Sequence, residues 1–178
     1  MIIQSTWESE RLEIRDLNSQ EIDEVQALYK TSSDISLWGS GEPEAGYIRH
    51  CFLEGDLPPN GTKKNYKIQT IKTNIENIDL IGLLSIYCGY PTENIAYISF
   101  LCIGNQFKSL GYGQEVINQL IEELRKLEYK EIRINVSLKN WSALRFWIRL
   151  GFDKINGIYG DKEYKENTIA NLELSRLL

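Results

Sequence analysis

The sequence lacks any excess of positive charge. Its 178 residues include 20 Lys and Arg against 25 Asp and Glu, so the formal net charge is −5 at pH 7. Proteins that bind nucleic acid contact its phosphates through clustered Lys and Arg, and we find no such cluster here. The composition therefore argues against a nucleic-acid-binding protein and suits a cationic partner such as an amine.

Cysteine and histidine are also scarce. Cys51, Cys88 and Cys102 lie in apolar segments without the spacing of a CxxC or Cys/His metal site, and His50 is the single histidine. We therefore expect reduced thiols in the core and no bound metal. Cysteine used in this way is typical of a cytoplasmic protein, which is the location we predict.

Long apolar runs are missing as well. No window approaches the roughly 18 apolar residues of a membrane-spanning helix. Trp7 and Glu8 follow the N-terminus without the pattern of a secretory signal. Repeats, low-complexity tracts and long linkers are not found either, so we expect one domain over residues 1–178 and no membrane partner.

The sequence does contain an ordered series of strand and helix patterns. Asn18 or Ser19 with Glu21 predicts a capped helix. Further helices are expected near residues 47–52, 112–127 and 142–150, with Glu122 and Glu123 on the outside of the third. Strands are expected over residues 11–15, 65–71, 80–87, 95–103, 131–136, 152–158 and 168–174. Antiparallel runs combined with strand-helix-strand units imply a mixed α/β fold with α+β character, one sheet of six to seven strands and about four helices.

The segment from Ile103 to Gly113 carries the clearest functional signal. It reads Ile-Gly-Asn-Gln-Phe-Lys-Ser-Leu-Gly-Tyr-Gly and joins a strand pattern to an amphipathic helix pattern. Unpaired N–H groups at a helix N-terminus favour anionic oxygens, and glycine lets a ligand approach the backbone. The segment therefore predicts a pyrophosphate site. A dinucleotide fingerprint would need Gly or Ala at Val116, and the Walker pattern is missing, so both of those alternatives fail.

Two motifs in this order resemble the GCN5-related N-acetyltransferase (GNAT) family. Residues 108–113, Lys-Ser-Leu-Gly-Tyr-Gly, are similar to its Gln/Arg-x-x-Gly-x-Gly/Ala pattern, with lysine at the first position. Residues 140–152, Asn-Trp-Ser-Ala-Leu-Arg-Phe-Trp-Ile-Arg-Leu-Gly-Phe, are similar to its second signature. The resemblance covers nearly the whole chain. It implies a GNAT fold with a splayed strand pair, and an enzyme that moves an acetyl group from acetyl-CoA to a primary amine in a ternary complex.

The resemblance also implies where the cofactor binds. Backbone N–H groups of residues 108–113 would hold the pyrophosphate of coenzyme A, and free peptide groups of the preceding strand would pair with pantetheine. Asn140 either bonds the pantetheine arm or caps its helix. The implied cofactor-binding residues are Leu101, Cys102, Ile103, Lys108, Ser109, Leu110, Gly111, Tyr112, Gly113, Asn140 and Phe146.

Two catalytic positions of the family hold other residues here. The usual tyrosine acid falls on Trp147, which cannot supply a proton near neutral pH, and the glutamate base of some members falls on Tyr97. We predict Tyr159 as the acid and Leu101, through its backbone N–H, as the group that polarises the thioester. Other candidate acids are Tyr164, Tyr112 and Ser142, unless the thiolate leaves unassisted. Candidate bases are Glu93, Asp34, Glu42 and His50.

The acceptor is the least defined part of the prediction. Asp34, Trp38 and Glu42 are expected to bind it, because acidic and aromatic side chains attract a cation. The acceptor is a small-molecule amine or a peptide amine. The alternatives left open are a protein N-terminal or lysine acetyltransferase, a non-catalytic acyl-CoA sensor and an interaction module. The protein is expected to be a monomer or a homodimer.

Overall fold

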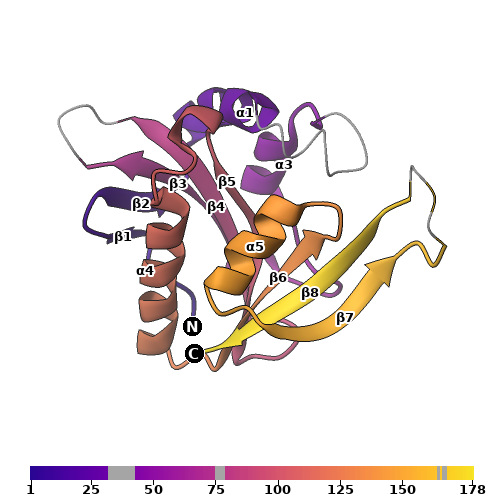
Figure 1. Ribbon diagram of the computed structural model, residues 1–178. Helices are drawn as coiled ribbons and strands as arrows, with labels where there is room; N and C mark the ends of the chain where they lie inside the picture. The colour runs from indigo at the N-terminus through magenta and orange to yellow at the C-terminus, as the bar shows by residue number, and fades with distance from the viewer. Residues whose placement is uncertain (32–42, 75–78, 164, 166–167) are drawn as a thin grey trace.

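A computed structural model describes residues 1–31, 43–74, 79–163, 165 and 168–178. Eight strands form one sheet in the order β1-β2-β3-β4-β5-β6-β8-β7 (Figure 1). The strands are β1 (Thr6–Glu8), β2 (Leu12–Asp16), β3 (Tyr66–Thr73), β4 (Leu80–Cys88), β5 (Ile95–Ile103), β6 (Glu131–Ser137), β7 (Lys154–Gly160) and β8 (Ala170–Leu177). The α-helices in the described ranges are α1 (Ile22–Thr31), α3 (Tyr47–Leu53), α4 (Tyr112–Lys126) and α5 (Trp141–Arg149).

The mixed α/β sheet predicted from the sequence is confirmed. β1 to β5 pair in succession and antiparallel, β5 and β6 pair parallel, and β8 pairs antiparallel with both β6 and β7. The expected count of six to seven strands was too low, because β1 is only three residues long and too short to show a period of two. β1 is a strand because it pairs with β2, where Trp7 lies opposite Ile14, and its own three residues give no sign of it.

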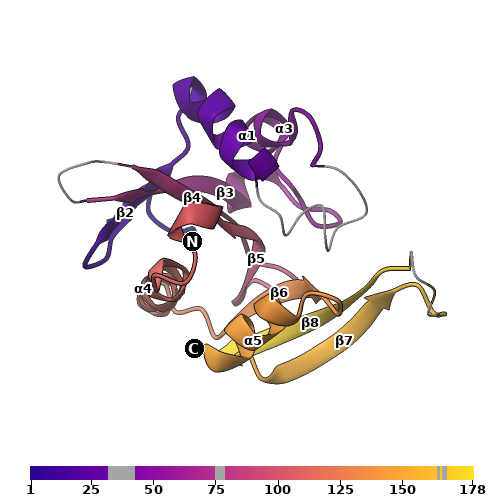
Figure 2. The ribbon, with the colours of Figure 1, turned by 45° about the horizontal axis from the view of Figure 1, so that its top comes forward.

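The helices cover the two faces of the sheet and define two cores. α1 and α3 lie on one face and α4 and α5 on the other (Figure 1, Figure 2). Val116 and Leu120 of α4 bury their side chains in the larger core, while Val25 of α1 and Ile48 of α3 belong to the smaller one. Both cores are apolar where a helix meets the sheet, so burial of these faces stabilises the layered arrangement.

The ends of two helices differ in how closely the sequence predicts them. Asn18 and Glu21 form the expected capping box, after which a short 3-10 turn leads into α1. On α4, Glu122 is exposed as predicted, but the prediction for Glu123 was wrong because its side chain is only 7% exposed. Gln119 and Lys126 cover its carboxylate with hydrogen bonds of 3.1 and 2.7 Å. A polar partner on the same helix therefore lets a glutamate lie at the edge of the core.

β5 and β6 separate halfway along their length. Their register runs only from Ile95 opposite Glu131 to Ile98 opposite Ile134. β5 nevertheless remains paired with β4 as far as Ile103, which lies opposite Gly82. One side of the second half of β5 therefore loses its neighbouring strand, as the diverging ribbons in Figure 2 illustrate.

The sequence predicted neither a membrane span nor a metal site. In the ranges given above, no helix has the length and apolar character needed to cross a membrane. The same ranges contain no group of three or more His, Cys, Asp or Glu side chains suited to hold a metal ion. Cys51, Cys88 and Cys102 are buried, as predicted.

Candidate active site

The turn before α4 exposes the first N–H groups of the helix. Gly111 occupies the N-cap position with φ of 86°, in the left-handed region that glycine adopts most easily, and no side chain caps the helix there. Ser109 also has a positive φ, of 64°. Leu110 between them is 53% exposed. The first turn of α4 thus presents backbone donors and the positive end of the helix dipole, which together suit an anion.

Gly113 lies where three elements meet. A Cβ atom added there would be 3.3 Å from Cζ of Phe146 on α5 and 3.7 Å from Cγ1 of Ile103 on β5. The contact with Phe146 is tighter than ordinary packing and the one with Ile103 is ordinary, so a larger residue at Gly113 would have to displace the Phe146 ring. The structure thereby places Phe146, a residue of the second motif, beside the turn of residues 108–113, which is the first motif.

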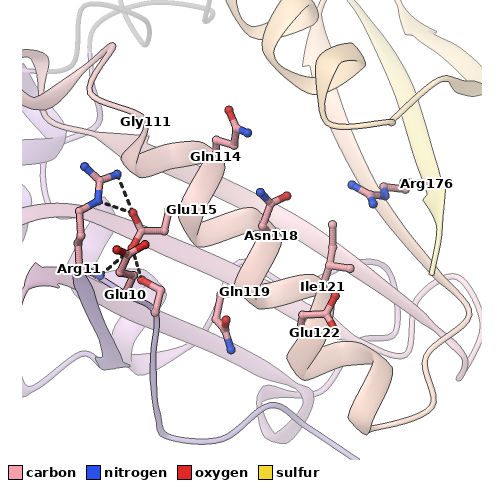
Figure 3. Close-up of a pocket in the computed structure, with 11 residues that line it drawn as sticks. Glu10, Arg11, Gly111, Gln114, Glu115, Asn118, Gln119, Ile121, Glu122 and Arg176 are labelled. Carbon is pink, nitrogen blue, oxygen red and sulfur yellow. Dashed lines mark hydrogen bonds and ion pairs between the residues drawn. The ribbon is translucent and has the colours of Figure 1, made fainter.

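Arg11 secures the turn from a distant part of the chain. Its Nη1 and Nη2 atoms donate to the Leu110 carbonyl at 3.3 and 3.4 Å, and Nη2 lies 2.7 Å from Glu115 Oε2 (Figure 3). Its guanidinium also lies 4.5 Å from the ring centroid of Tyr112. Sequence reasoning used Arg11 only as the start of a strand. The contacts join residues about a hundred positions apart, so no local pattern could have revealed them.

Glu115 in the first turn of α4 is held as a carboxylate. Burial acts to raise the pKa of Glu115, but hydrogen bonds from Ser9 Oγ and from the backbone and side chain of Arg11 outweigh it and lower the pKa below its ordinary value. The Ser9 bond measures 2.6 Å. A carboxylate near the N-terminus of a helix also interacts favourably with the helix dipole.

A wide, open cavity of about 610 Å³ lies along α4 beside these contacts. It is lined by polar side chains of the helix, among them Gln114, Asn118 and Gln119, and by Arg176 from β8 (Figure 3). Because neither β5 nor β6 contributes to its lining, it lies away from the splayed strands. We therefore do not assign the acyl group to this cavity.

The backbone of β5 alternates between its two sides. The Gly104 N–H donates to the Ile81 carbonyl at 2.8 Å, and the Cys102 carbonyl points at Gly82, so both residues turn their peptide groups toward β4. Alternation then directs those of Leu101 and Ile103 to the opposite side, where pairing with β6 has ended. Of the three predicted strand residues, Leu101 and Ile103 thus face the opening with their backbone, and Cys102 does not.

A β-bulge marks the start of this opening. The register with β4 shifts so that Ile98 lies opposite Ile86 and Phe100 opposite Ser85, which leaves Ser99 without an opposite residue. Bulges re-aim backbone and side chains and are frequent beside active sites. This one coincides with the last residue pair between β5 and β6.

The second motif is divided between a helix cap and the core. Asn140 caps α5, because its side chain accepts a hydrogen bond of 2.9 Å from the Ala143 N–H. Trp147 is only 4% exposed, and its ring packs edge-on against Phe146 and Phe152, at centroid distances of 4.9 and 5.0 Å. The position of the family's tyrosine therefore holds an indole fixed by aromatic packing.

A smaller cavity of about 270 Å³ opens where β5 and β6 part. Ser99 and Asn135, the first residues beyond the last pair of the two strands, both line it. The other lining residues are Asp56, Leu57, Pro58, Pro59, Tyr87, Tyr90 and Tyr97. A concave site lined by aromatic rings and a few polar atoms is typical of a small-molecule site. Residues 56–59, with Pro58 and Pro59, lie in the loop between α3 and β3.

The predicted catalytic and acceptor residues are distributed unevenly. Tyr159 is 54% exposed on β7 and does not line this cavity. His50 and Glu93 are exposed and do not line it. Tyr112 contacts Arg11, and Ser142 lies in the first turn of α5. Asp34, Trp38, Glu42 and Tyr164 fall outside the described residues.

Solved structures share this arrangement at low sequence identity. A probable acetyltransferase of the GNAT family from Chromobacterium violaceum has a TM-score of 0.77 at 11% identity, covering 97% of this chain and 86% of that one. A protein provisionally named a ribosomal-protein-serine acetyltransferase, from Vibrio cholerae, has a TM-score of 0.72 at 19% identity over 100% of both chains. A spermidine N-acetyltransferase chimera from Vibrio cholerae and hSSAT has a TM-score of 0.69 at 16% identity, covering 94% and 96%.

These likenesses show that the chain has the GNAT fold, so the fold implied by the resemblance in the sequence is confirmed. More specifically, residues 83–160 match the family described as FR47-like protein. That range includes both motifs, the parted strands and the turn before α4. No curated protein sequence matches the chain significantly.

Proposed function

We propose that this protein is an acetyl-CoA-dependent N-acetyltransferase that moves an acetyl group to a primary amine. One observation carries the proposal: the edge of β5 that is no longer paired with β6 lies next to the N-terminus of α4, which no side chain caps. The first feature offers peptide groups to the amide-bearing pantetheine arm, and the second offers N–H groups to a pyrophosphate. A GNAT fold supports the same activity.

In this proposal each part of coenzyme A has its own partners. The backbone of residues 108–113 holds the pyrophosphate, with Lys108 adding a positive charge. Pantetheine lies along β5 and pairs with Leu101 and Ile103, while Phe146 and the Asn140 turn border the entrance. Cys102 contributes packing rather than peptide groups, because its carbonyl points at β4.

The reaction proposed is direct attack of the amine nitrogen on the thioester carbonyl carbon. Negative charge develops on the carbonyl oxygen, and an N–H of β5 at Leu101 is the donor proposed to stabilise it. When the C–S bond breaks, the leaving thiolate has a conjugate acid with a pKa of roughly 8.5, so it can depart without a strong acid. Tyr159 is the proposed proton donor, since Trp147 is fixed in the core.

The acceptor proposed is a small primary amine that enters the cavity of about 270 Å³. The spermidine N-acetyltransferase among the structural neighbours favours this class, and the ribosomal-protein-serine acetyltransferase keeps a peptide amine as the second candidate. A non-catalytic acyl-CoA sensor is favoured by the tryptophan at the position of the family's acid and by Tyr97 at the position of its glutamate base. The proposed location is the cytoplasm.

A pair of glycines at two helix N-termini tests the cofactor site. We expect Gly111→Glu to weaken acetyl-CoA binding at least 10²-fold, because a carboxylate would occupy the place proposed for a pyrophosphate. Gly46→Glu is the matched control, since Gly46 is the N-cap of α3, has φ of 83° and has open space around it. Calorimetric titration with acetyl-CoA measures both. Equal affinities in the two variants would refute the assignment of the pyrophosphate to this turn.

A further inference from the structure

Tyr97 is joined to two other strands by a chain of polar contacts. Its Oη donates to Oε2 of Glu173 on β8 at 3.1 Å. The other carboxylate oxygen of Glu173 accepts from Nη1 of Arg133 on β6 at 2.9 Å, and Nε of Arg133 donates to Glu131 at 2.6 Å. The Glu131, Arg133 and Glu173 side chains are between 11% and 17% exposed. The group is therefore largely shielded from water.

This network carries an unbalanced negative charge. Two carboxylates, those of Glu131 and Glu173, share the single guanidinium of Arg133. The charge left over faces Tyr97, which lines the cavity of about 270 Å³ together with Asp56. In a shielded site such a charge attracts a cation more strongly than it would in water.

The phenol of Tyr97 is a proton donor toward Glu173. Burial and, next, the charge of Glu173 raise the pKa of Tyr97 above its ordinary value, so the phenol stays protonated near neutral pH. The ring of Tyr90 packs edge-on against that of Tyr97 at 5.8 Å and helps to orient it. The charged and titratable groups around Tyr97 are Glu173, Arg133, Glu131, Tyr90, Tyr159, Asp56 and Tyr87, which lies opposite Tyr97 on β4.

We infer that Tyr97 and Glu173 receive a primary ammonium group in this cavity and relay its proton away from the nitrogen. An N–H bond of the ammonium breaks as an O–H bond forms at Tyr97 Oη. The original Tyr97 proton moves along the existing hydrogen bond to Glu173 Oε2. The nitrogen lone pair released in this way attacks the thioester carbon. The inference rests on the proposed function, and it makes Tyr97 a catalytic residue and Glu173 a positioning residue that also accepts the proton.

The geometry of the splayed strands supports this assignment. An alkyl ammonium has a pKa near 10.4, so nearly all of it must lose a proton before it can attack at neutral pH. Tyr97 precedes the last residue pair of β5 and β6, and Ser99, two positions on, lies at the bulge where the opening begins. The relay therefore ends next to the strand segment proposed to hold the thioester. β5 has no carboxylate of its own at Tyr97, so Glu173 of β8 supplies one.

The test compares Tyr97→Phe and Glu173→Gln with the parent protein, using spermidine, ethanolamine and butylamine as acceptors and thiol release as the readout. We expect kcat to fall about 10²-fold in each single variant, and to fall little further in the double variant because both residues act in one relay. The deficit should shrink about tenfold per pH unit as the pH rises toward the pKa of the amine. Acetyl-CoA affinity should stay within twofold of that of the parent.

Two remote substitutions serve as matched controls. Tyr129→Phe removes a phenol that donates to the Met1 carbonyl, and Glu123→Gln alters a carboxylate of α4 that is similarly shielded. Neither should change kcat or its pH dependence. Additive losses in the double variant, or equal deficits at every pH, would mean a structural role and overturn the relay. Acetyl-CoA binding without release from any of the three amines would overturn the ammonium assignment, whereas no acetyl-CoA binding would overturn the proposed function itself.

Discussion

The N-termini of α4 and α5 lie on the same face of the sheet but are finished in opposite ways. α5 begins at Asn140, whose side chain accepts the Ala143 N–H at 2.9 Å. α4 begins at Gly111, which has no side chain to offer. Helices are normally stabilised by about 1 kcal/mol through such a cap. Glycine at the N-cap costs only about a few tenths of a kcal/mol, so α4 leaves its first N–H donors without a side-chain cap beside the parted strands at little cost in stability.

The difference is reinforced from outside α4. Arg11 and Ser9 hold Glu115, and Arg11 also binds the Leu110 carbonyl, so these side chains fix the turn through a carboxylate and a carbonyl oxygen rather than through its N–H groups. A terminus can thus be rigid without being capped. This combination is what pre-organised binding of an anion requires, because little conformational entropy is lost when the ligand arrives.

Of the substitutions that test the difference between the two helix N-termini, we expect the largest effect, a loss of acetyl-CoA affinity, from Lys108 at the uncapped turn. Lys108→Ala should weaken acetyl-CoA binding about tenfold, since a positive charge next to the proposed pyrophosphate is lost. The salt dependence of the affinity should decrease as well. Calorimetry at two salt concentrations measures both quantities. Lys30→Ala at the end of α1 is the control, and an equal loss there would point to a general charge effect.

The capped helix should respond in stability rather than in binding. Asn140→Ala should lower the free energy of unfolding by about 1 kcal/mol, because the Ala143 N–H loses its acceptor. Acetyl-CoA affinity should change less than threefold. Denaturant unfolding and calorimetry on the same sample separate the two effects. A tenfold loss of affinity at unchanged stability would instead show that Asn140 binds pantetheine.

The smallest effect concerns the carboxylate that fixes α4. The pKa of Glu115 is lowered in the folded protein, so its stabilisation is present above its unfolded pKa of about 4.3 and is lost as the pH falls through the folded value. Glu115→Gln should therefore reduce the difference in Tm between pH 7 and pH 3 by a few degrees. Thermal unfolding followed at both pH values provides the measurement. If Glu115→Gln left the Tm difference unchanged, the contacts of Arg11 and Ser9 with residue 115 would contribute to stability without the negative charge of Glu115.

The sequence predicts local features of the fold and the site well, and contacts between distant segments poorly. The capping box at Asn18 and Glu21 and the strand from Ile95 to Ile103 are both observed as predicted, because each depends on neighbouring residues. The glycine turn is likewise a local signal. β1 was missed because three residues carry no period, and its pairing with β2 fixes it.

The site shows the same division. The proposed cofactor turn follows from a motif, but the Tyr97–Glu173 bond joins residues 76 positions apart and crosses an intervening strand. In the sequence Tyr97 only replaces the family's glutamate base, because the carboxylate that it contacts, Glu173, is supplied by β8. The predicted acceptor residues Asp34, Trp38 and Glu42 lie outside the described residues, so that part of the hypothesis stays a prediction.

The separation of β5 from β6 has a consequence for stability. If pantetheine pairs with Leu101 and Ile103, the cofactor serves as an extra strand that partly closes a gap within the sheet. Ligand binding would then protect those two amides from hydrogen exchange, while the amide of Cys102, which faces β4, would change little. The free energy of unfolding would also rise with the logarithm of the acetyl-CoA concentration, so the protein would be most stable when acetyl groups are abundant.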